Sequence, residues 1–224
     1  MEEIIRRNLS NMSLVPPSVG MTILLRHSHR FEIPKGEFGN EILLTPEGKK
    51  SAMELGRNIL LPISSVLTSP VSRCVQTSQC LLEGQANSTI ELRYDTRLGN
   101  PGAFISDSKF AGSTYLEMGH RKLNNNYIAR RPVNGMFPIE EGVNRLFSSV
   151  FPIPKAPEVK ILVSHDSIIG FLLAWIFSQT DMNLDFWPKT LESVVFWETE
   201  NSHYLAWREK SFLLNALDMK AVNN

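Results

Sequence analysis

The sequence contains little cysteine, and this limits how the fold can be held together. Only two of the 224 residues are cysteines, Cys74 and Cys80. They fall in one predicted helix, six residues apart and on different faces, so we predict that they are not bonded to each other. This cysteine usage suits a reducing cytoplasm and excludes a small disulfide-stabilised scaffold.

Long hydrophobic runs are also missing. The most apolar stretch, residues 161–177, contains His165, Asp166 and two serines, and it is too short and too polar to span a bilayer. Residues 1–20 lack the apolar region of a secretory signal, and we predict a weakly ordered leader there. These features predict a cytoplasmic protein.

An excess of either charge is absent as well. The 23 basic and 23 acidic residues cancel, so no overall charge recruits nucleic acid or an anionic membrane. Any bound anion must therefore be held locally. The length and the hydrophobic content of 42% suit a soluble globular protein with a sizeable core. The oligomeric state is left open, with a homodimer as one option.

Short apolar runs alternate with segments of helical periodicity along the chain. Strands are expected at residues 21–25, 64–68, 89–94, 160–163, 193–197 and 203–207. Helices are expected after Thr45-Pro46, after Ser69-Pro70, and over residues 139–151 and 167–178. This order predicts a three-layer α/β/α sandwich with a mostly parallel, mixed central sheet, whose last two strands are antiparallel.

The predicted domain organisation is a single domain over residues 21–224. Residues 98–138 differ from the rest, since they are rich in Gly, Asn and Pro and weakly periodic. A stretch of this length within a compact domain is typical of a lid or an insert. Its basic side chains are expected mainly to be solvated, and they are Arg121, Lys122, Arg130 and Arg131.

Polar groups follow three of the predicted strands, at residues 26–30, 69–73 and 164–166. In open α/β sheets, ligands bind beyond the carboxyl ends of the strands. Arginine forks bind tetrahedral oxyanions, and helix N-termini add backbone N–H donors. The three segments together predict a phosphate site.

The same segments resemble motifs of the histidine phosphatase superfamily, which includes phosphoglycerate mutases and acid phosphatases. L-L-R-H-S-H-R, residues 24–30, resembles the R-H-G and R-H-x-x-R signature. L-T-P-E-G-K-K-S-A, residues 44–52, and T-S-P-V-S-R-C-V-Q-T-S, residues 68–78, are similar to L-T-x-x-G-x-x-Q-A and S-S-P-x-x-R-x-x-Q-T-A. V-S-H-D, residues 163–166, resembles the second histidine motif. The four motifs occur in order and cover most of the chain, whereas residues 98–138 match none.

The resemblance implies a phosphoglycerate mutase-like fold and a metal-independent phosphomonoester hydrolase acting on a small phosphorylated molecule. It implies that His27 is the nucleophile, forming a phosphohistidine. Arg26, Arg73 and His165 would hold the non-bridging oxygens, with Arg30 as a further clamp. Flanking arginines are expected to keep His27 neutral, because like charges lower the pKa of an imidazole.

The proton donor is left open between two kinds of residue. In one branch of the family an Asp directly after the second histidine donates the proton, and Asp166 matches it. In the other branch the donor is an upstream Glu, for which the loop candidates are Glu32, Glu37, Glu41 and Glu117. Asp166 is our first choice, although it is also suited to cap the following helix.

The chain departs from the family signature beside the predicted nucleophile. Ser28 stands where the signature has Gly, and it is expected to add a hydrogen bond to phosphate or to restrict the substrate. His29 is not specified by the signature, and it is either a substrate contact or a polar loop residue.

Three alternative functions stay open. A phosphomutase of the same fold would need a second anchoring site, for which the sequence offers no candidate. A metal-dependent hydrolase would use His27, His29, His165 and Asp166 as ligands, but the neighbouring arginines would repel a divalent cation. A non-catalytic phosphate-binding module would retain the fold alone. We expect neither a metal nor another cofactor, and the sequence does not identify the substrate.

Overall fold

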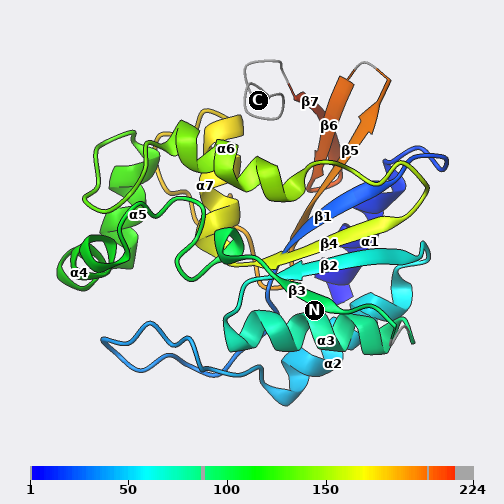
Figure 1. Cartoon of the computed structure of the whole chain (residues 1–224), viewed down its shortest axis with the longest axis horizontal. Coiled ribbons are helices and arrows are strands. Elements are labelled where there is room, and N and C mark those ends of the chain that lie inside the picture. Colours follow the sequence, from blue (N-terminus) through cyan, green and yellow to red (C-terminus); the bar gives the residue numbers. More distant parts are fainter. Residues whose placement is uncertain (1, 87–88, 201, 215–224) are drawn as a thin grey trace.

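A seven-stranded mixed sheet forms the centre of the computed structural model, which describes residues 2–86, 89–200 and 202–214 (Figure 1). The strand order is β3-β2-β4-β1-β5-β6-β7. The first four strands in this order are parallel, whereas β5, β6 and β7 are each antiparallel to the preceding strand. The strands are β1 (Met21–Arg26), β2 (Ile63–Thr68), β3 (Leu92–Tyr94), β4 (Val159–Ser164), β5 (Ser193–Thr199), β6 (Ser202–Trp207) and β7 (Lys210–Leu214).

Helices cover both faces of this sheet, which makes three layers (Figure 1). One face packs against α1 (Glu2–Ser13), α2 (Pro46–Asn58) and α3 (Ser72–Gly84). The other packs against α5 (His120–Ile128), α6 (Ile139–Val150) and α7 (Asp166–Ile176). Successive strand residues point to opposite faces, so Ile23 and Leu25 join the first core while Leu24 joins the second. The predicted α/β/α sandwich is confirmed.

The predicted elements occur in the predicted order, with differences at their ends. The sequence did not predict β7, and β3 is only three residues long. The sheet has three parallel and three antiparallel pairings, so the parallel part makes up half of it. Helix α3 begins at Ser72 with Val71 as its N-cap, two residues later than the Ser-Pro pair indicates.

The N-terminal segment departs from the expectation of a weakly ordered leader, because most of it forms α1. Ile5 is buried in the core of the α1–α3 face, and Asn8 and Asn11 are fully buried. Their side-chain amides donate to backbone carbonyl oxygens at the start of β5, Asn8 to Leu191 at 2.7 Å and Asn11 to Ser193 at 3.3 Å. The amphipathic spacing of Ile5, Leu9 and Met12 is the sequence signal that indicates this helix.

Residues 98–138 contain two helices, α4 (Ser108–Met118) and α5. Part of the segment belongs to the main core, since Phe104, Leu123 and Tyr127 are buried there against α7. Helix α4 lies farther out, beyond α5 in the view of Figure 1, and exposes Phe110 and Leu116. Within the described residues, no helix has the length and apolar character needed to cross a membrane.

Candidate active site

Three segments that follow neighbouring parallel strands meet at one edge of the sheet. β4 lies between β1 and β2, and Arg26, at the end of β1, pairs with Ser164, at the end of β4. The chain continues from these strand ends into His27, Ser69 and His165. Residues far apart in the sequence are thereby brought together, as the position of ligand sites in open α/β sheets predicts.

His27 is buried, with 3% of its surface exposed, and it is fixed by hydrogen bonds on both ring nitrogens. Its Nδ1 lies 2.8 Å from the carbonyl oxygen of Ser28. A carbonyl oxygen only accepts, so Nδ1 carries the proton and Nε2 keeps its lone pair. That lone pair accepts a hydrogen bond from Nε of Arg73 at 3.1 Å.

The surroundings of His27 favour its neutral form. Burial lowers the pKa of the imidazole well below its ordinary value, and His165, Arg73 and Arg26 lower it further by charge repulsion. A neutral ring with an unprotonated Nε2 is the form that can act as a nucleophile, once the hydrogen bond from Arg73 is released.

Arg73 connects both histidines. It lies in the first turn of α3 and is almost completely buried. Besides its contact with His27, its guanidinium donates to the carbonyl oxygen of Gly39 at 2.7 Å and to Nδ1 of His165 at 3.3 Å. A buried cation at a helix N-terminus opposes the helix dipole, and a bound anion would relieve that repulsion.

His165 is the N-cap residue of α7, and its ring lies 5.5 Å from that of His27 between centroids. Because Nδ1 accepts from Arg73, the proton is on Nε2, which lies 3.0 Å from the hydroxyl of Ser69. Burial, followed by repulsion from Arg73, lowers the pKa of His165. Both histidines are therefore neutral and share one arginine.

Arg26 and Asp166 form an ion pair at the rim of this group, with 3.0 Å between Nη2 and Oδ2. Arg26 also donates from Nη1 to the carbonyl oxygen of Pro188 at 2.8 Å. Its Nε is buried and has no hydrogen-bond partner among the described residues. The pKa of Asp166 is raised by burial but lowered more by Arg26, His120 and His165, so that the net shift is downward.

Ser28 is placed differently from the other predicted contacts. Its side chain is fully buried, and its hydroxyl donates to the carbonyl oxygen of Gly48 at 2.7 Å. Gly48 lies in the first turn of α2, where a Cβ atom would come within 2.1 Å of the carbonyl oxygen of His29. The Ser28 hydroxyl therefore joins the signature turn to α2 instead of pointing at a ligand.

His29 and Arg30 lie on the outer side of the turn. The His29 side chain is exposed. Arg30 is partly buried and donates to the carbonyl oxygen of Phe31 at 2.8 Å. Burial and repulsion from Arg26 lower the pKa of Arg30, which indicates that the two guanidinium groups lie near each other.

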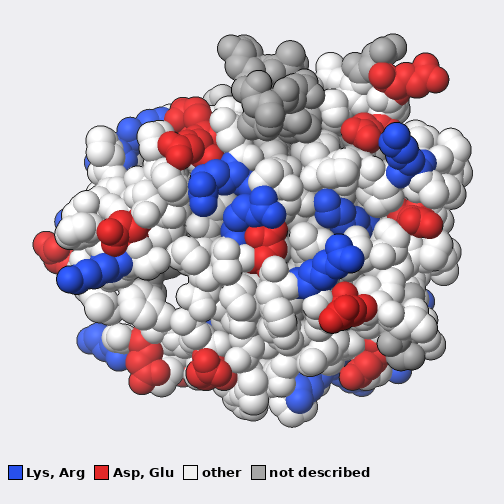
Figure 2. All heavy atoms as spheres, in the orientation of Figure 1, with Lys and Arg blue, Asp and Glu red and all other residues white. Residues whose placement is uncertain are grey.

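Residues of α4 and α5 approach this rim from the opposite side. The His120 and Tyr115 rings lie 6.2 Å apart, and the Tyr115 ring lies 5.5 Å from that of Phe38 in the loop after the signature turn. His120 is one of the groups that lower the pKa of Asp166. In the orientation of Figure 1, a small opening in the surface lies beside the part of the molecule with α4 and α5 (Figure 2).

The remaining predicted side chains are spread over the surface. All four candidate glutamates are exposed, and Glu41 accepts a hydrogen bond from Ser72 at 3.3 Å. Glu32 is near enough to Arg30 to raise its pKa against the larger effect of burial. The four basic residues of the insert are all exposed, in agreement with the expected solvated face: Arg121, Lys122, Arg130 and Arg131.

A support behind the site was missed by sequence analysis. The backbone N–H of Arg26 donates to the carbonyl oxygen of Glu192, and the carbonyl oxygen of His27 accepts from Leu191. Asn8 of α1 donates to the carbonyl oxygen of Leu191 at 2.7 Å and accepts from the backbone N–H of Ser193 at 3.1 Å. Helix α1 therefore binds the segment against which the end of β1 lies.

Glu192 is the second part of this support. Its carboxylate is fully buried, and it accepts hydrogen bonds from Arg7 of α1 at 3.2 Å and from Arg208 at 3.0 Å. Its Oε2 also accepts from the backbone N–H of Lys189 at 2.8 Å. Buried charges need partners of this kind, so the pairings fix the segment that supplies the Pro188 carbonyl to Arg26.

Comparison with solved structures shows the same fold at low sequence identity. A protein described as mycobacterial hydrolase 2 has a TM-score of 0.54 at 15% identity, with 92% of this chain and 97% of that chain covered. A phosphoglycerate mutase from Bacillus anthracis str. Sterne has a TM-score of 0.52 at 15% identity, with coverages of 92% and 96%. A mutant phosphoserine phosphatase from Entamoeba histolytica, in complex with phosphoserine, has a TM-score of 0.54 at 16% identity, with coverages of 87% and 95%.

Sequence comparison identifies the family. A search of curated protein sequences gives no match. A sequence model of the histidine phosphatase superfamily (branch 1) matches residues 22–208, which include all four motifs and every residue of the candidate site. The chain therefore belongs to branch 1 of the histidine phosphatase superfamily.

Proposed function

We propose that the protein is a metal-independent phosphomonoester hydrolase that works through a phosphohistidine on His27. The observation that carries this proposal is the position of the Arg73 guanidinium, which donates to Nε2 of His27 at 3.1 Å and to Nδ1 of His165 at 3.3 Å. A guanidinium that lies between two neutral imidazoles and donates to both suits a phosphate group whose phosphorus lies next to Nε2 of His27.

In the proposed first step, the Nε2 lone pair of His27 attacks phosphorus, and the bond from phosphorus to the leaving oxygen breaks. The leaving oxygen keeps the electron pair of that bond and takes up a proton. The N–H groups of Arg73 shift from the histidine nitrogens to the phosphate oxygens, where negative charge is held in the transition state. The Ser28 carbonyl, 2.8 Å from Nδ1, then stabilises the positive ring of the phosphohistidine.

In the second step, water attacks phosphorus and the bond to Nε2 breaks, which returns neutral His27 and releases phosphate. The proton that water loses passes to the base left by the first step. Small phosphorylated molecules are the proposed substrates.

Arg26 supports the same phosphate position. Its buried Nε has no partner among the described residues, and leaving a buried donor unsatisfied costs about 1–3 kcal/mol. A phosphate oxygen would supply the missing acceptor. Arg30, which lies near Arg26, is proposed as a further clamp on the outer side.

Asp166 is proposed as the proton donor, although in the free protein its lowered pKa keeps it ionised. A bound phosphate dianion competes for Arg26 and repels the carboxylate, and both effects raise the proton affinity of Asp166. Asp166 would therefore gain its proton as the substrate binds. Glu32 is the alternative donor, because its charge raises the pKa of Arg30.

The placement of the side chains does not favour the metal-dependent alternative. Within the described residues, no three or more His, Cys, Asp or Glu side chains are grouped as a metal ion would require. Of the four residues proposed as ligands, His29 is exposed on the outer side of the turn and Asp166 is paired with Arg26.

Replacement of the nucleophile tests the proposal. In His27→Ala, we expect hydrolysis of p-nitrophenyl phosphate to fall by at least about 10³-fold, since removal of a nucleophile typically has an effect of this size or larger. Acid quenching of the wild type with labelled substrate should trap an acid-labile phosphoenzyme that His27→Ala does not form. Circular dichroism and thermal melting would establish that the variant is folded.

His203→Ala is the matched control, because this histidine lies on β6 against Phe151 and Glu198. It should keep the wild-type rate. A His27→Ala variant that hydrolyses substrate at the wild-type rate would refute the nucleophile. Loss of wild-type activity on chelation, with recovery on adding zinc or manganese, would favour the metal-dependent alternative.

A further inference from the structure

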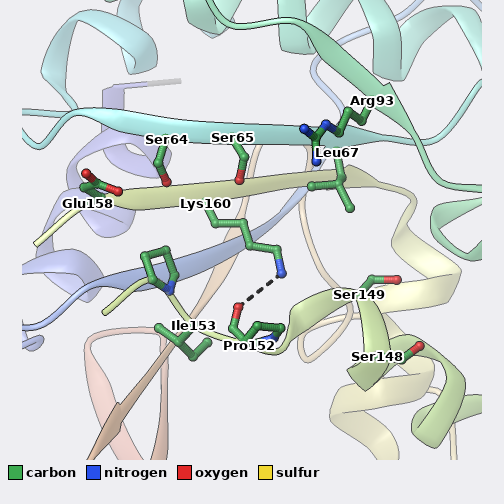
Figure 3. A pocket seen from close by; sticks show the side chains of 11 residues that line it. Ser64, Ser65, Leu67, Arg93, Ser148, Ser149, Pro152, Ile153, Glu158 and Lys160 are labelled. Carbon is green, nitrogen blue, oxygen red and sulfur yellow. Dashed lines mark hydrogen bonds between the residues drawn. The ribbon is translucent and has the colours of Figure 1, made fainter. Parts of the chain in front are cut away.

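A cavity lined largely by polar residues lies away from the catalytic residues, on the α6 side of the sheet. It has a volume of about 420 Å³, which falls in the range of small-molecule sites. Its floor is formed by β2 and β4, β3 forms one edge, and the end of α6 with the following turn forms the opposite wall (Figure 3). None of the catalytic residues lines it.

Lys160 in the floor breaks the apolar pattern of a central strand. It shares a face of β4 with Leu162, which belongs to the core of the α6 side, so an apolar residue is expected at this position. Its ammonium donates to the carbonyl oxygens of Val150 at 3.1 Å and Pro152 at 3.3 Å. An ammonium has three N–H donors, and the third has no acceptor among the described residues.

The electrostatic environment of Lys160 also lacks a close counter-charge. Burial lowers its pKa to about 8, and repulsion from Arg97 adds to this effect, while Asp95 opposes it. Asp95 is already occupied, because it accepts from Arg97 at 2.9 Å and from Ser149 at 2.7 Å. The ammonium therefore faces the cavity without a carboxylate of its own.

Arg93 supplies a second cation to the same space. It extends from the edge strand β3 across β2, on the side where Lys160 points (Figure 3). Its guanidinium has no hydrogen-bond or ion-pair partner among the described residues. Ser65, which pairs with Lys160 across the strands, also has a hydroxyl without a partner there. Basic side chains gather between α6 and β3 on this face, with acidic ones among them (Figure 2).

The acidic lining residue lies at the other end of the cavity. Glu158 is next to Ser64, whereas Arg93 and Lys160 lie toward Leu67 (Figure 3). The cavity is thus polarised, with free N–H and O–H donors at one end. We propose that it binds a small organic molecule through a phosphate or carboxylate group held between Arg93, Lys160 and Ser65. A bare ion would fill only a small part of the volume.

Counting bound anions tests this site directly. Equilibrium dialysis with labelled inorganic phosphate should give two bound ions per wild-type chain, one in each site. Arg93→Gln is an exposed substitution on an edge strand, and it should raise the dissociation constant of the second ion at least tenfold. Lys50→Gln removes the same charge from the exposed face of α2 and should retain both ions. Labelled citrate, measured in the same way, distinguishes a carboxylate from a phosphate as the preferred group.

A crystallographic measurement locates the second ion. Crystals soaked in tungstate should show anomalous density between Arg93 and Lys160 as well as beside His27. Ser65→Ala, which removes a donor without changing the charge, should lower the occupancy of the cavity alone. One phosphate and no citrate per wild-type chain, or an Arg93→Gln variant that binds both anions as tightly as wild type, would overturn the proposal.

Discussion

The two walls of the candidate active site are built in different ways. The wall at the sheet edge consists of buried, hydrogen-bonded groups, in which Arg73 alone contacts His27, His165 and Gly39. The other wall, for which we take α4 and the loop before α2, carries exposed apolar side chains, among them Phe31, Phe38, Phe110 and Leu116. Fixed donors suit a phosphate group common to all substrates, because preorganised dipoles need not reorganise during the reaction. An exposed apolar wall suits the part of the substrate that varies.

The largest effect is expected from breaking the sheet-edge wall at Arg73. Arg73→Ala removes donors to two histidines and a clamp on the phosphate, so we expect kcat/KM to fall by about 10³-fold. After burial and His165, Arg73 is the next cause of the lowered pKa of His27. Its loss should raise that pKa, so the acidic limb of the kcat/KM profile should move to higher pH.

Steady-state kinetics across pH would measure both changes. Arg57→Ala, which removes an exposed arginine paired with Glu54 on α2, is the matched control and should alter neither. An unshifted acidic limb in Arg73→Ala would show that the limb does not report the protonation of His27.

A smaller effect is expected at Asp166, on the rim between the walls. General acid catalysis contributes about 10²–10⁴-fold, and mainly for poor leaving groups. Asp166→Asn should therefore slow hydrolysis of methyl phosphate by about 10²-fold, but that of p-nitrophenyl phosphate by only about tenfold or less. The ratio of the two kcat values is the measurement.

Equal losses on both substrates would assign Asp166 a different task, the positioning of Arg26. Glu32→Gln would then be measured on the same pair of substrates. A selective loss on methyl phosphate in that variant would make Glu32 the proton donor.

The smallest effect is expected from the exposed wall. Phe38→Ala removes a half-exposed ring that lies 5.5 Å from that of Tyr115. We expect about a fivefold rise in KM for naphthyl phosphate, which corresponds to about 1 kcal/mol of lost apolar contact. KM for methyl phosphate should not change.

Leu60→Ala, at a nearly fully exposed position beyond the end of α2, is the control for loss of apolar surface. A Phe38→Ala variant with the same KM for naphthyl phosphate as wild type would show that the ring does not contact the leaving group. The distinction between the two walls would then have to rest on other residues of α4.

The residues at the sheet edge could be predicted from sequence, because each lies in a short motif that can be recognised from its immediate neighbours in the chain. Each of its segments directly follows a short apolar strand, and parallel strands bring their ends to one side. This is why the neighbourhood of Arg26, His27, Arg73 and His165 follows from four short motifs. The orientation of Ser28 could not be predicted, since the sequence does not reveal that its side chain turns toward the backbone of Gly48.

The rest of the site depends on contacts between distant residues. Asn8 interrupts the apolar stripe of α1, so it resembles a surface residue, yet it is buried against Leu191 and Ser193. The approach of His120 to Asp166 depends on how α5 packs against α7, for which no short motif exists. Contacts of this kind leave no periodic pattern in the sequence, because each joins residues that are far apart along the chain.

The hydrogen bonds between α1 and the segment behind the nucleophile have a consequence for folding during translation. Helix α1 is synthesised well before its partners Leu191, Ser193 and Glu209, which lie 183 to 198 residues farther along the chain. The ribosome synthesises the chain at about 5–20 residues per second, and a domain generally folds as a unit. About ten seconds or longer therefore pass between the synthesis of α1 and the synthesis of the residues against which its apolar face packs. The backbone that supports His27 is completed only when β5 and β6 have emerged, so the nascent chain carries its catalytic motifs well before it carries a working site.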